Sequence, residues 1–136
     1  MALTAEQISF RYEKGGRRIL QKLDLTVAPG ERLGIAAPSG RGKTTLCKIL
    51  AGYEHPDEGC VLVDGKPLDS IRGYCPVQMV WQHPELAVDP RMRLGRTLAE
   101  ADRLEQRVID GLGIEPAWMS RYPSELSGGE LQRFCI

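Results

Sequence analysis

The chain has 136 residues, and its 18 Lys and Arg balance 18 Asp and Glu, so the formal net charge is zero. This length suits one domain of ordinary size, and the charge balance argues against a protein that binds nucleic acid through bulk positive charge. Hydrophobic residues make up 42% of the chain, which excludes a disordered polymer. No apolar run approaches the roughly 20 residues of a membrane-spanning helix, and we expect no signal peptide.

The charge balance conceals an uneven distribution along the chain. Residues 1–50 carry nine basic against four acidic side chains, whereas residues 51–90 carry two against seven. The positive excess coincides with the segment that contains a phosphate-binding motif, described below. Four cysteines without Cys-x-x-Cys spacing argue against a zinc site or a redox pair, and they favour a reducing, cytoplasmic setting.

Several segments before residue 82 have the patterns of β-strands. Alternation of apolar and polar residues predicts half-buried strands, and short continuous apolar runs predict more buried ones. The predicted strands are Gln7–Tyr12, Leu23–Val27, Arg32–Ala36, residues 60–63 and Val77–Trp81. The turn signals Gly15-Gly16, Pro29-Gly30 and Asp64-Gly65 separate them.

Helical spacing of apolar residues occurs in two regions. The first is Thr44–Ala51, with Gly52 as the residue after the helix end. The second begins after Pro90, where Leu94, Leu98 and Ala101, and then Leu104, Val108 and Leu112, have helical spacing. Asp102 is predicted to cap the later helix, with Glu105 at the capping-box position. The chain is therefore predicted to be rich in strands up to about residue 82 and helical after it.

The segment APSGRGKTT, residues 37–45, lies between a predicted buried strand and a predicted helix. It matches the P-loop pattern with Ala37 in the first glycine place, where a methyl group is tolerable if φ is negative. Small residues let backbone N–H groups approach an anion, and the following helix points its positive end at that anion. Lys43 is expected to bridge the β- and γ-phosphates and Thr44 to hold Mg²⁺. The residues expected to bind the nucleotide are Ala37, Pro38, Ser39, Gly40, Arg41, Gly42, Lys43, Thr44 and Thr45.

A second motif, LSGGELQR over residues 126–133, begins a predicted helix. Ser127 and Glu130 have the spacing of a capping box, which by itself only starts a helix. A functional interpretation uses the same geometry, because Gly128 and Gly129 leave the first N–H groups of that helix open to an anion. The motif taken alone leaves both interpretations open.

Together, the P-loop and the LSGGE motif resemble the ATP-binding cassette (ABC) family, the ATPase subunits of ABC transporters, over nearly the whole chain. The resemblance implies that Tyr12 stacks on adenine and that Gln82, in VWQHPEL, reaches Mg²⁺ and the attacking water. Lys43 and Gln82 would thus be the catalytic residues for ATP hydrolysis that this chain contains. The signature residues expected to contact ATP held by a second subunit are Ser127, Gly128, Gly129 and Glu130. The stretches WQHPELAVDPRMRL and RYPSELSGGELQR look most similar to the peptide and nickel importers.

Two departures from the family pattern affect the expected activity. Glu130 stands where the family usually has glutamine, and its carboxylate would repel the γ-phosphate unless it folds back onto the Ser127 amide. The family continues after the signature into the Walker B strand, with its Mg²⁺ aspartate and catalytic glutamate, and later a switch histidine. The 136 residues contain none of these. We therefore expect a fragment that binds nucleotide with little or no turnover.

The fold implied by the resemblance is an α/β P-loop NTPase of ABC type, present as a single partial domain over residues 1–136 that is incomplete at the C-terminus. Three parts are expected within it. They are an antiparallel β subdomain (about 1–35 and 58–74), a partial RecA-like P-loop core (31–52 and 75–82) and an α-helical subdomain that carries the signature (about 90–136).

The function implied by the resemblance is that of an ATP-binding subunit which couples ATP binding and hydrolysis to transport, in peptide or nickel import. The expected cofactors are ATP and Mg²⁺. The expected partners are a second ATPase subunit, identical or related, and membrane-spanning permease subunits, which would place the chain in the cytoplasm at the inner face of the cell membrane. Two alternatives stay open: an ABC-type ATPase with a soluble role, and another P-loop kinase or GTPase.

Overall fold

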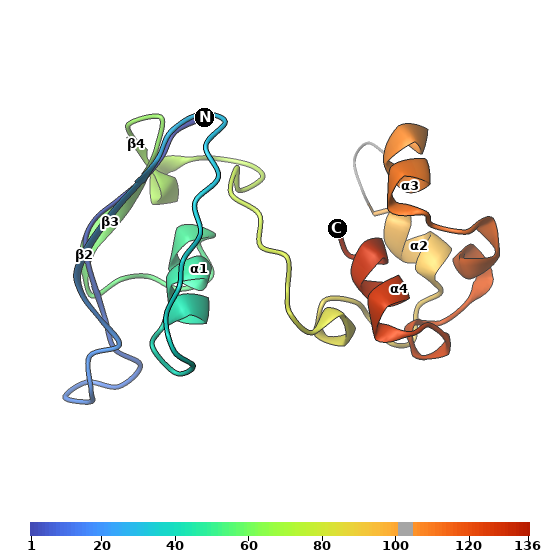
Figure 1. The fold of residues 1–136 in the computed structure, drawn as a ribbon, viewed down its shortest axis with the longest axis horizontal. Coiled ribbons are helices and arrows are strands. Elements are labelled where there is room, and N and C mark those ends of the chain that lie inside the picture. The colour runs from blue at the N-terminus through green and yellow to red at the C-terminus, as the bar shows by residue number, and fades with distance from the viewer. Residues whose placement is uncertain (101–104) are drawn as a thin grey trace. The chain divides into compact units, whose positions relative to one another are not determined.

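The strand-rich part of the sequence, with its one helical segment, and the helical part after it fold as two separate units in the computed structural model (Figure 1). The structure describes residues 1–100 and 105–136. Unit 1 comprises Met1–Met79 and unit 2 comprises Val80–Ile136. No helix within the described ranges is both long and apolar enough to cross a membrane. The finer subdomain boundaries stay a prediction.

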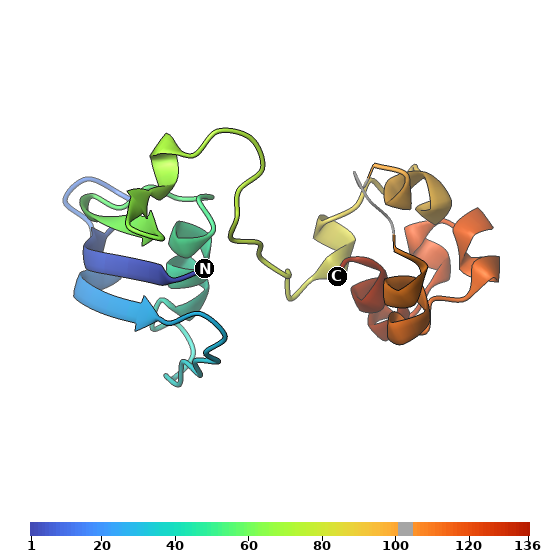
Figure 2. The same cartoon turned by 90° about the horizontal axis from the view of Figure 1, so that it is seen from above.

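Unit 1 is an antiparallel sheet with one helix packed against one face (Figures 1 and 2). The strand order is β2-β1-β3-β4. The bounds are β1 Leu3–Phe10, β2 Leu20–Val27, α1 Lys43–Leu50, β3 Glu58–Val63 and β4 Lys66–Pro67. Leu46 and Ile49 of α1 pack with Ile8 of β1 and Val61 of β3. Burial of each such side chain contributes about 1.5–3 kcal/mol, so this contact holds the helix, and the loop before it, against the sheet.

Strand β1 begins earlier and ends earlier than the alternation predicts, so Tyr12 lies beyond it. Its register shifts between Ala5 and Ile8, and Gln7 has a φ of +51°. Such a bulge adds one residue to the strand and reverses the facing of the residues that follow. Ser9 alternates with Ile8 and Phe10 along the strand, yet all three residues are buried, and the Ser9 hydroxyl accepts a hydrogen bond from the Lys22 N–H at 3.1 Å.

Several local predictions for unit 1 are confirmed. The apolar side chains of β2 alternate as expected, and Asp64-Gly65 forms the turn between β3 and β4 with positive φ at both residues. Helix α1 ends where predicted, with Gly52 at a φ of +74°. The Gly52 and Tyr53 N–H groups donate to the Ile49 and Lys48 carbonyls. This is the hydrogen-bond pattern of a glycine-terminated helix end.

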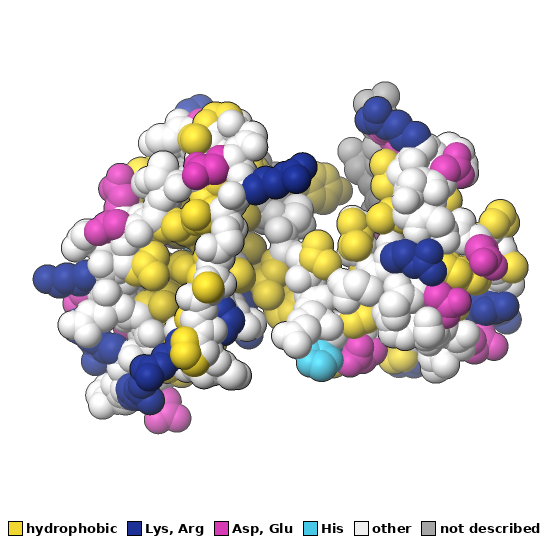
Figure 3. All heavy atoms as spheres, viewed as in Figure 1, with side chains coloured by type: hydrophobic (Ala, Val, Ile, Leu, Met, Phe, Trp, Pro, Cys, Tyr) yellow, Lys and Arg dark blue, Asp and Glu magenta, His cyan; other side chains and the backbone are white. Residues whose placement is uncertain are grey.

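Two predicted strands are absent from the structure. Arg32–Ala36 and Val77–Trp81 both have irregular backbone, and the four strands of unit 1 form the only sheet within the described residues. Leu33 and Ile35, expected to be buried, are 43% and 42% exposed. An apolar run becomes a strand only when neighbouring strands satisfy its N–H and C=O groups, and neither segment has joined a sheet. Apolar side chains accordingly appear at the surface in Figure 3.

Unit 2 is helical, as predicted for the chain after Pro90. Its elements are η2 Pro84–Leu86, α2 Leu94–Leu98, α3 Gln106–Leu112, η3 Pro116–Ser120, η4 Pro123–Glu125 and α4 Gly128–Phe134. Its core gathers the buried side chains of Leu94, Ile109, Ile114, Trp118, Leu131 and Phe134. Val108, which has helical spacing with Leu112 in the sequence, is 46% exposed.

Only part of the predicted cap of the second helix lies within the described residues. Ala101, Asp102 and Leu104 lie outside the described residues. Glu105 is itself the N-cap residue of α3 and makes no side-chain cap hydrogen bond, so it does not occupy the third position of that helix. The four cysteines are free thiols. None of them is buried, and Cys47 is exposed on α1.

Candidate functional site

The P-loop of unit 1 is the irregular segment that leads into helix α1. Gly40 and Gly42 have φ values of +75° and +84°, in the left-handed region that glycine adopts without strain. A Cβ on Gly42 would also lie 2.9 Å from Cγ2 of Ile19, whereas one on Gly40 would meet nothing within 4 Å. Ala37 is not among the residues with positive φ, so its methyl group fits the first glycine place. The loop therefore keeps glycine where its backbone requires it.

The ammonium group of Lys43 lies against the backbone of this loop. Its Nζ donates hydrogen bonds to the carbonyl oxygens of Ala37 at 2.6 Å and Pro38 at 2.9 Å. Both bonds are exposed to solvent, so they can be exchanged for bonds to a stronger acceptor at low cost. An ionised phosphate oxygen is such an acceptor, because hydrogen bonds between charged groups are the stronger ones.

The first turn of α1 completes the surroundings of Lys43. It carries no acidic side chain, so nothing offsets the positive end of the helix dipole. Thr44 is exposed, whereas Thr45 is buried. These features fit a phosphate group held by Lys43 and backbone N–H groups, and a Mg²⁺ ion held by the Thr44 hydroxyl. The assignment of these residues to nucleotide remains a prediction.

Tyr12 lies next to the P-loop helix, although it is remote from it in sequence. Its hydroxyl forms a hydrogen bond with Thr45 Oγ1 at 3.0 Å. Its ring packs edge-on against Phe10, with ring centroids 4.9 Å apart and an interplanar angle of 88°. The ring is otherwise open, and the residue is 58% exposed. Unit 1 therefore brings an exposed aromatic ring to the helix that follows the phosphate loop.

The signature segment forms the N-terminus of α4 in unit 2. Ser127 is the N-cap: its Oγ accepts from the Glu130 N–H at 3.4 Å, and Glu130 Oε2 accepts from the Ser127 N–H at 2.6 Å. The capping box predicted from the sequence is thus confirmed. Gly128 and Gly129 are exposed, and a Cβ on either would meet nothing within 4 Å. No packing within the described residues requires glycine at these two positions.

The carboxyl group of Glu130 is held in its ionised form. Hydrogen bonds from the Ser127 side chain and backbone lower the pKa of Glu130 from its ordinary value of 4.5, with smaller contributions from Arg121 and Arg133. In the folded state this carboxylate therefore turns back onto its own helix terminus. The repulsion that a free carboxylate would exert on a nearby phosphate is reduced by this arrangement.

We expect Glu130→Gln to reduce the dependence of unit 2 stability on acid. The folded-state pKa of Glu130 is lowered, so its stabilisation is complete above about pH 4.5 and is lost as the pH falls through the lowered value. Glutamine still fills the capping box without titrating. Thermal unfolding followed by tryptophan fluorescence should show a smaller fall of Tm on acidification in Glu130→Gln than in the wild type, and the exposed Glu115→Gln should behave as wild type. An equal fall in both variants would contradict this.

Gln82 belongs to unit 2 and is exposed. The backbone on either side of it is tied to the signature helix. Gln132 Nε2 donates to the Trp81 carbonyl at 3.1 Å, and Cys135 Sγ donates to the Pro84 carbonyl at 3.7 Å. The sequence contained no signal for Gln132, because a single amide within a helix has no pattern that names its partner.

Arg133 is a second residue whose role the sequence did not indicate. Its guanidinium lies over the ring of the buried Trp118, 5.0 Å from the ring centroid. Its Nη1 also donates to the carbonyls of Leu112 and Gly113, both at 3.3 Å, at the C-terminus of α3. The signature helix is therefore fixed to the rest of unit 2 through residues just after its glycines.

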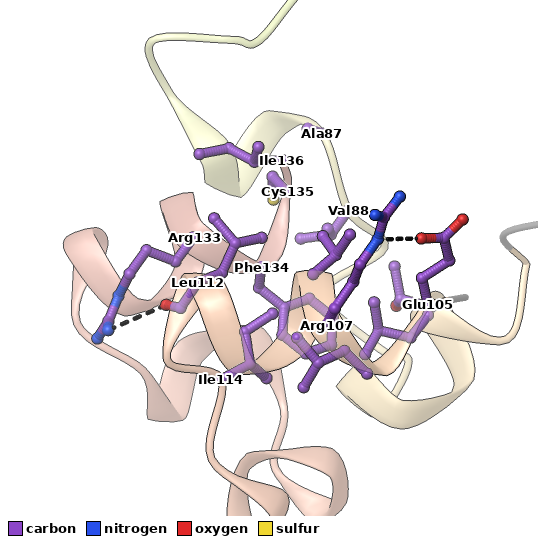
Figure 4. A pocket seen from close by; sticks show the side chains of 14 residues that line it. Ala87, Val88, Glu105, Arg107, Leu112, Ile114, Arg133, Phe134, Cys135 and Ile136 are labelled. Carbon is purple, nitrogen blue, oxygen red and sulfur yellow. Dashed lines mark hydrogen bonds and ion pairs between the residues drawn. The ribbon is translucent and has the colours of Figure 1, made fainter. Parts of the chain in front are cut away.

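Unit 2 also contains a cavity of about 550 Å³ between α2, α3 and α4 (Figure 4). Its lining is largely apolar, and at its rim Arg107 Nε pairs with Glu105 Oε2 at 2.5 Å. None of the residues predicted to bind nucleotide lines this cavity. An apolar lining does not suit a triphosphate, which requires donors and positive charge. This cavity is therefore separate from the predicted nucleotide site.

Comparison with known proteins assigns this arrangement to a family. The ABC transporter family matches residues 20–136. The nickel import ATP-binding protein NikE of Rhodospirillum rubrum is 35% identical over 140 residues, 88% of this chain and 50% of that protein. The taurine import ATP-binding protein TauB of Pseudomonas aeruginosa is 38% identical over 141 residues, 96% of this chain and 53% of that protein. The chain thus spans about half the length of these curated relatives.

The fold is likewise that of known cassettes. A solved ATP-binding cassette, dimeric in a post-hydrolysis state with ADP and Pi, has a TM-score of 0.77 to this chain at 19% identity, over 98% of this chain and 66% of that one. This likeness confirms the expected α/β P-loop NTPase fold of ABC type, and the family match decides against a P-loop kinase or GTPase. Since the family pattern covers most of the sequence, from β2 through the signature helix, the chain belongs to the ABC transporter family.

Proposed function

We propose that this chain is the nucleotide-binding part of an ATPase subunit of an ABC importer, and that it binds ATP with Mg²⁺ in unit 1. The observation that carries the proposal is the position of Lys43, whose ammonium lies on the P-loop carbonyls of Ala37 and Pro38 through exposed bonds. The exposed ring of Tyr12 at the same helix supplies a surface for the adenine base. Phosphate and base recognition thus lie on one folded unit.

Each residue has a defined part in this proposal. Lys43 leaves the loop carbonyls and donates to the β- and γ-phosphates, while backbone N–H groups of residues 39–45 bind the phosphate oxygens. Thr44 directs its exposed hydroxyl to Mg²⁺, which neutralises phosphate charge when bound. Tyr12 stacks on adenine. Gln82 contacts Mg²⁺ and the attacking water. We assign no residue of this chain as the general base.

The signature supports a proposal about partners. Gly128 and Gly129 are exposed and unrequired by packing, which suits close approach of a ligand held by another subunit. We propose that Ser127 and these glycines contact ATP bound to a second ATPase subunit, identical or related. Membrane-spanning permease subunits would complete the importer and hold the chain at the cytoplasmic face of the membrane.

The proposed cargo is nickel or a peptide. The nickel import relative and the stretches around Gln82 and Ser127 support this choice. The taurine import relative, of similar identity, supports only the broader statement that this chain serves an importer. An ABC-type ATPase with a soluble role is the alternative that uses the same nucleotide site.

Equilibrium dialysis of the full chain with radiolabelled ATP tests the proposal. We expect saturable binding of one ATP per chain, weakened by EDTA and competed by ADP but much less by AMP, because the phosphates beyond the first provide the acceptors for Lys43. Circular dichroism on the same sample shows that the chain is folded. Absence of saturable binding by a folded chain at millimolar ATP would refute the proposal.

A further inference from the structure

The hydrogen bond between Tyr12 and Thr45 joins two parts of the candidate site that are 33 residues apart in sequence. Tyr12 is the second residue after the end of β1, and Thr45 is the third residue of α1. The two oxygens are 3.0 Å apart, and either hydroxyl can be the donor. A side-chain hydrogen bond thus connects the exposed aromatic residue to the P-loop helix.

The two partners differ in exposure. Thr45 is 6% exposed, and a buried hydroxyl is costly unless it is hydrogen-bonded. Tyr12 is mostly exposed, and its ring is fixed at two points: its edge contact with Phe10 and its hydroxyl bond to Thr45. The phenol oxygen is therefore held from the buried side, while the rest of the ring stays accessible to a ligand.

We propose that Thr45 is a positioning residue for adenine recognition, acting through the Tyr12 hydroxyl. This inference rests on the proposed function. An unrestrained exposed ring loses rotational freedom when a base stacks on it, which weakens binding. The bond to Thr45 fixes the ring before the base arrives, and it fixes it relative to the helix that carries Lys43 and Thr44. The distance between the base platform and the phosphate loop is thereby set in the free protein.

A double-mutant cycle on the full chain tests this inference. Thr45→Val and Tyr12→Phe each remove one hydroxyl and keep the shape of the side chain. We expect each to weaken ATP binding about fivefold, the usual scale for one hydrogen bond, and the double variant to be no weaker than the weaker single one. Inorganic tripolyphosphate, which has no base, should bind Tyr12→Phe as tightly as it binds the wild type. Thr45→Ser should restore ATP binding, and Thr26→Val, on the exposed face of β2, is the matched control.

The outcomes separate this inference from the proposed function. If the wild-type chain binds no ATP, the proposed function fails. If the wild type binds ATP and the hydroxyl variants bind it equally well, only the positioning role is overturned. Additive losses in the double variant would show independent roles for the two hydroxyls. Loss of tripolyphosphate binding in Thr45→Val, but not in Tyr12→Phe, would place Thr45 on the phosphates instead.

Discussion

Replacing Lys43 by alanine is expected to weaken ATP binding by the full chain about 100-fold, since hydrogen bonds to ionised groups contribute about 1.5–3 kcal/mol each. In the free protein, Lys43 donates to the Ala37 and Pro38 carbonyls at the surface. Those carbonyl oxygens accept hydrogen bonds from water when the ammonium is removed. The variant should therefore keep the thermal stability of the wild type while it loses the phosphate contact.

Dialysis against ATP and against tripolyphosphate measures both parts of this expectation. The affinities for ATP and for tripolyphosphate should fall to a similar degree, because Lys43 contacts the phosphates and not the base. Lys66→Ala is the matched control: it removes one exposed lysine from the same unit, on β4 and outside the P-loop. Equal affinities of Lys43→Ala and Lys66→Ala for ATP would exclude the P-loop as the binding site.

Replacing Gly59 by alanine is expected to lower the free energy of unfolding of unit 1 by about 3 kcal/mol or more, from left-handed strain and overpacking together. Gly59 has a φ of +89° and lies opposite the bulge of β1. An added Cβ would lie 2.2 Å from the Glu6 carbonyl oxygen and 2.6 Å from that of Gln7. Both oxygens are backbone atoms of β1, an inner strand of the sheet, so neither can rotate away from the added Cβ as a flexible side chain could.

Gly65→Ala is the control that separates the two causes. Gly65 has a similar φ of +76°, but a Cβ there would meet nothing within 4 Å. We expect a cost of only about 1 kcal/mol for it. Far-UV circular dichroism in urea reports the unfolding of both units, whereas tryptophan fluorescence reports unit 2 alone, where both Trp81 and Trp118 lie, so a transition seen only by circular dichroism belongs to unit 1. Similar losses in the two variants would mean that the bulge yields to the added methyl group.

Much of the candidate site followed from short-range patterns in the sequence. The capping box of Ser127 and Glu130 and the glycine end of α1 at Gly52 are confirmed, because each depends on residues within one helical turn. The requirement for glycine at Gly42 and the tolerance of Ala37 belong to the same class. In each case the residue type itself selects the backbone conformation.

The tertiary structure decided what depends on contacts between remote segments. Arg32–Ala36 has the composition of a buried strand, yet it stays irregular, because a strand needs neighbours that satisfy its backbone. Ser9 is buried together with Ile8 and Phe10, which alternation alone could not reveal. The hydrogen bond between Tyr12 and Thr45 likewise arises only when β1 and α1 pack together. Local chemistry therefore determined the motifs of this protein, whereas packing determined which of them meet.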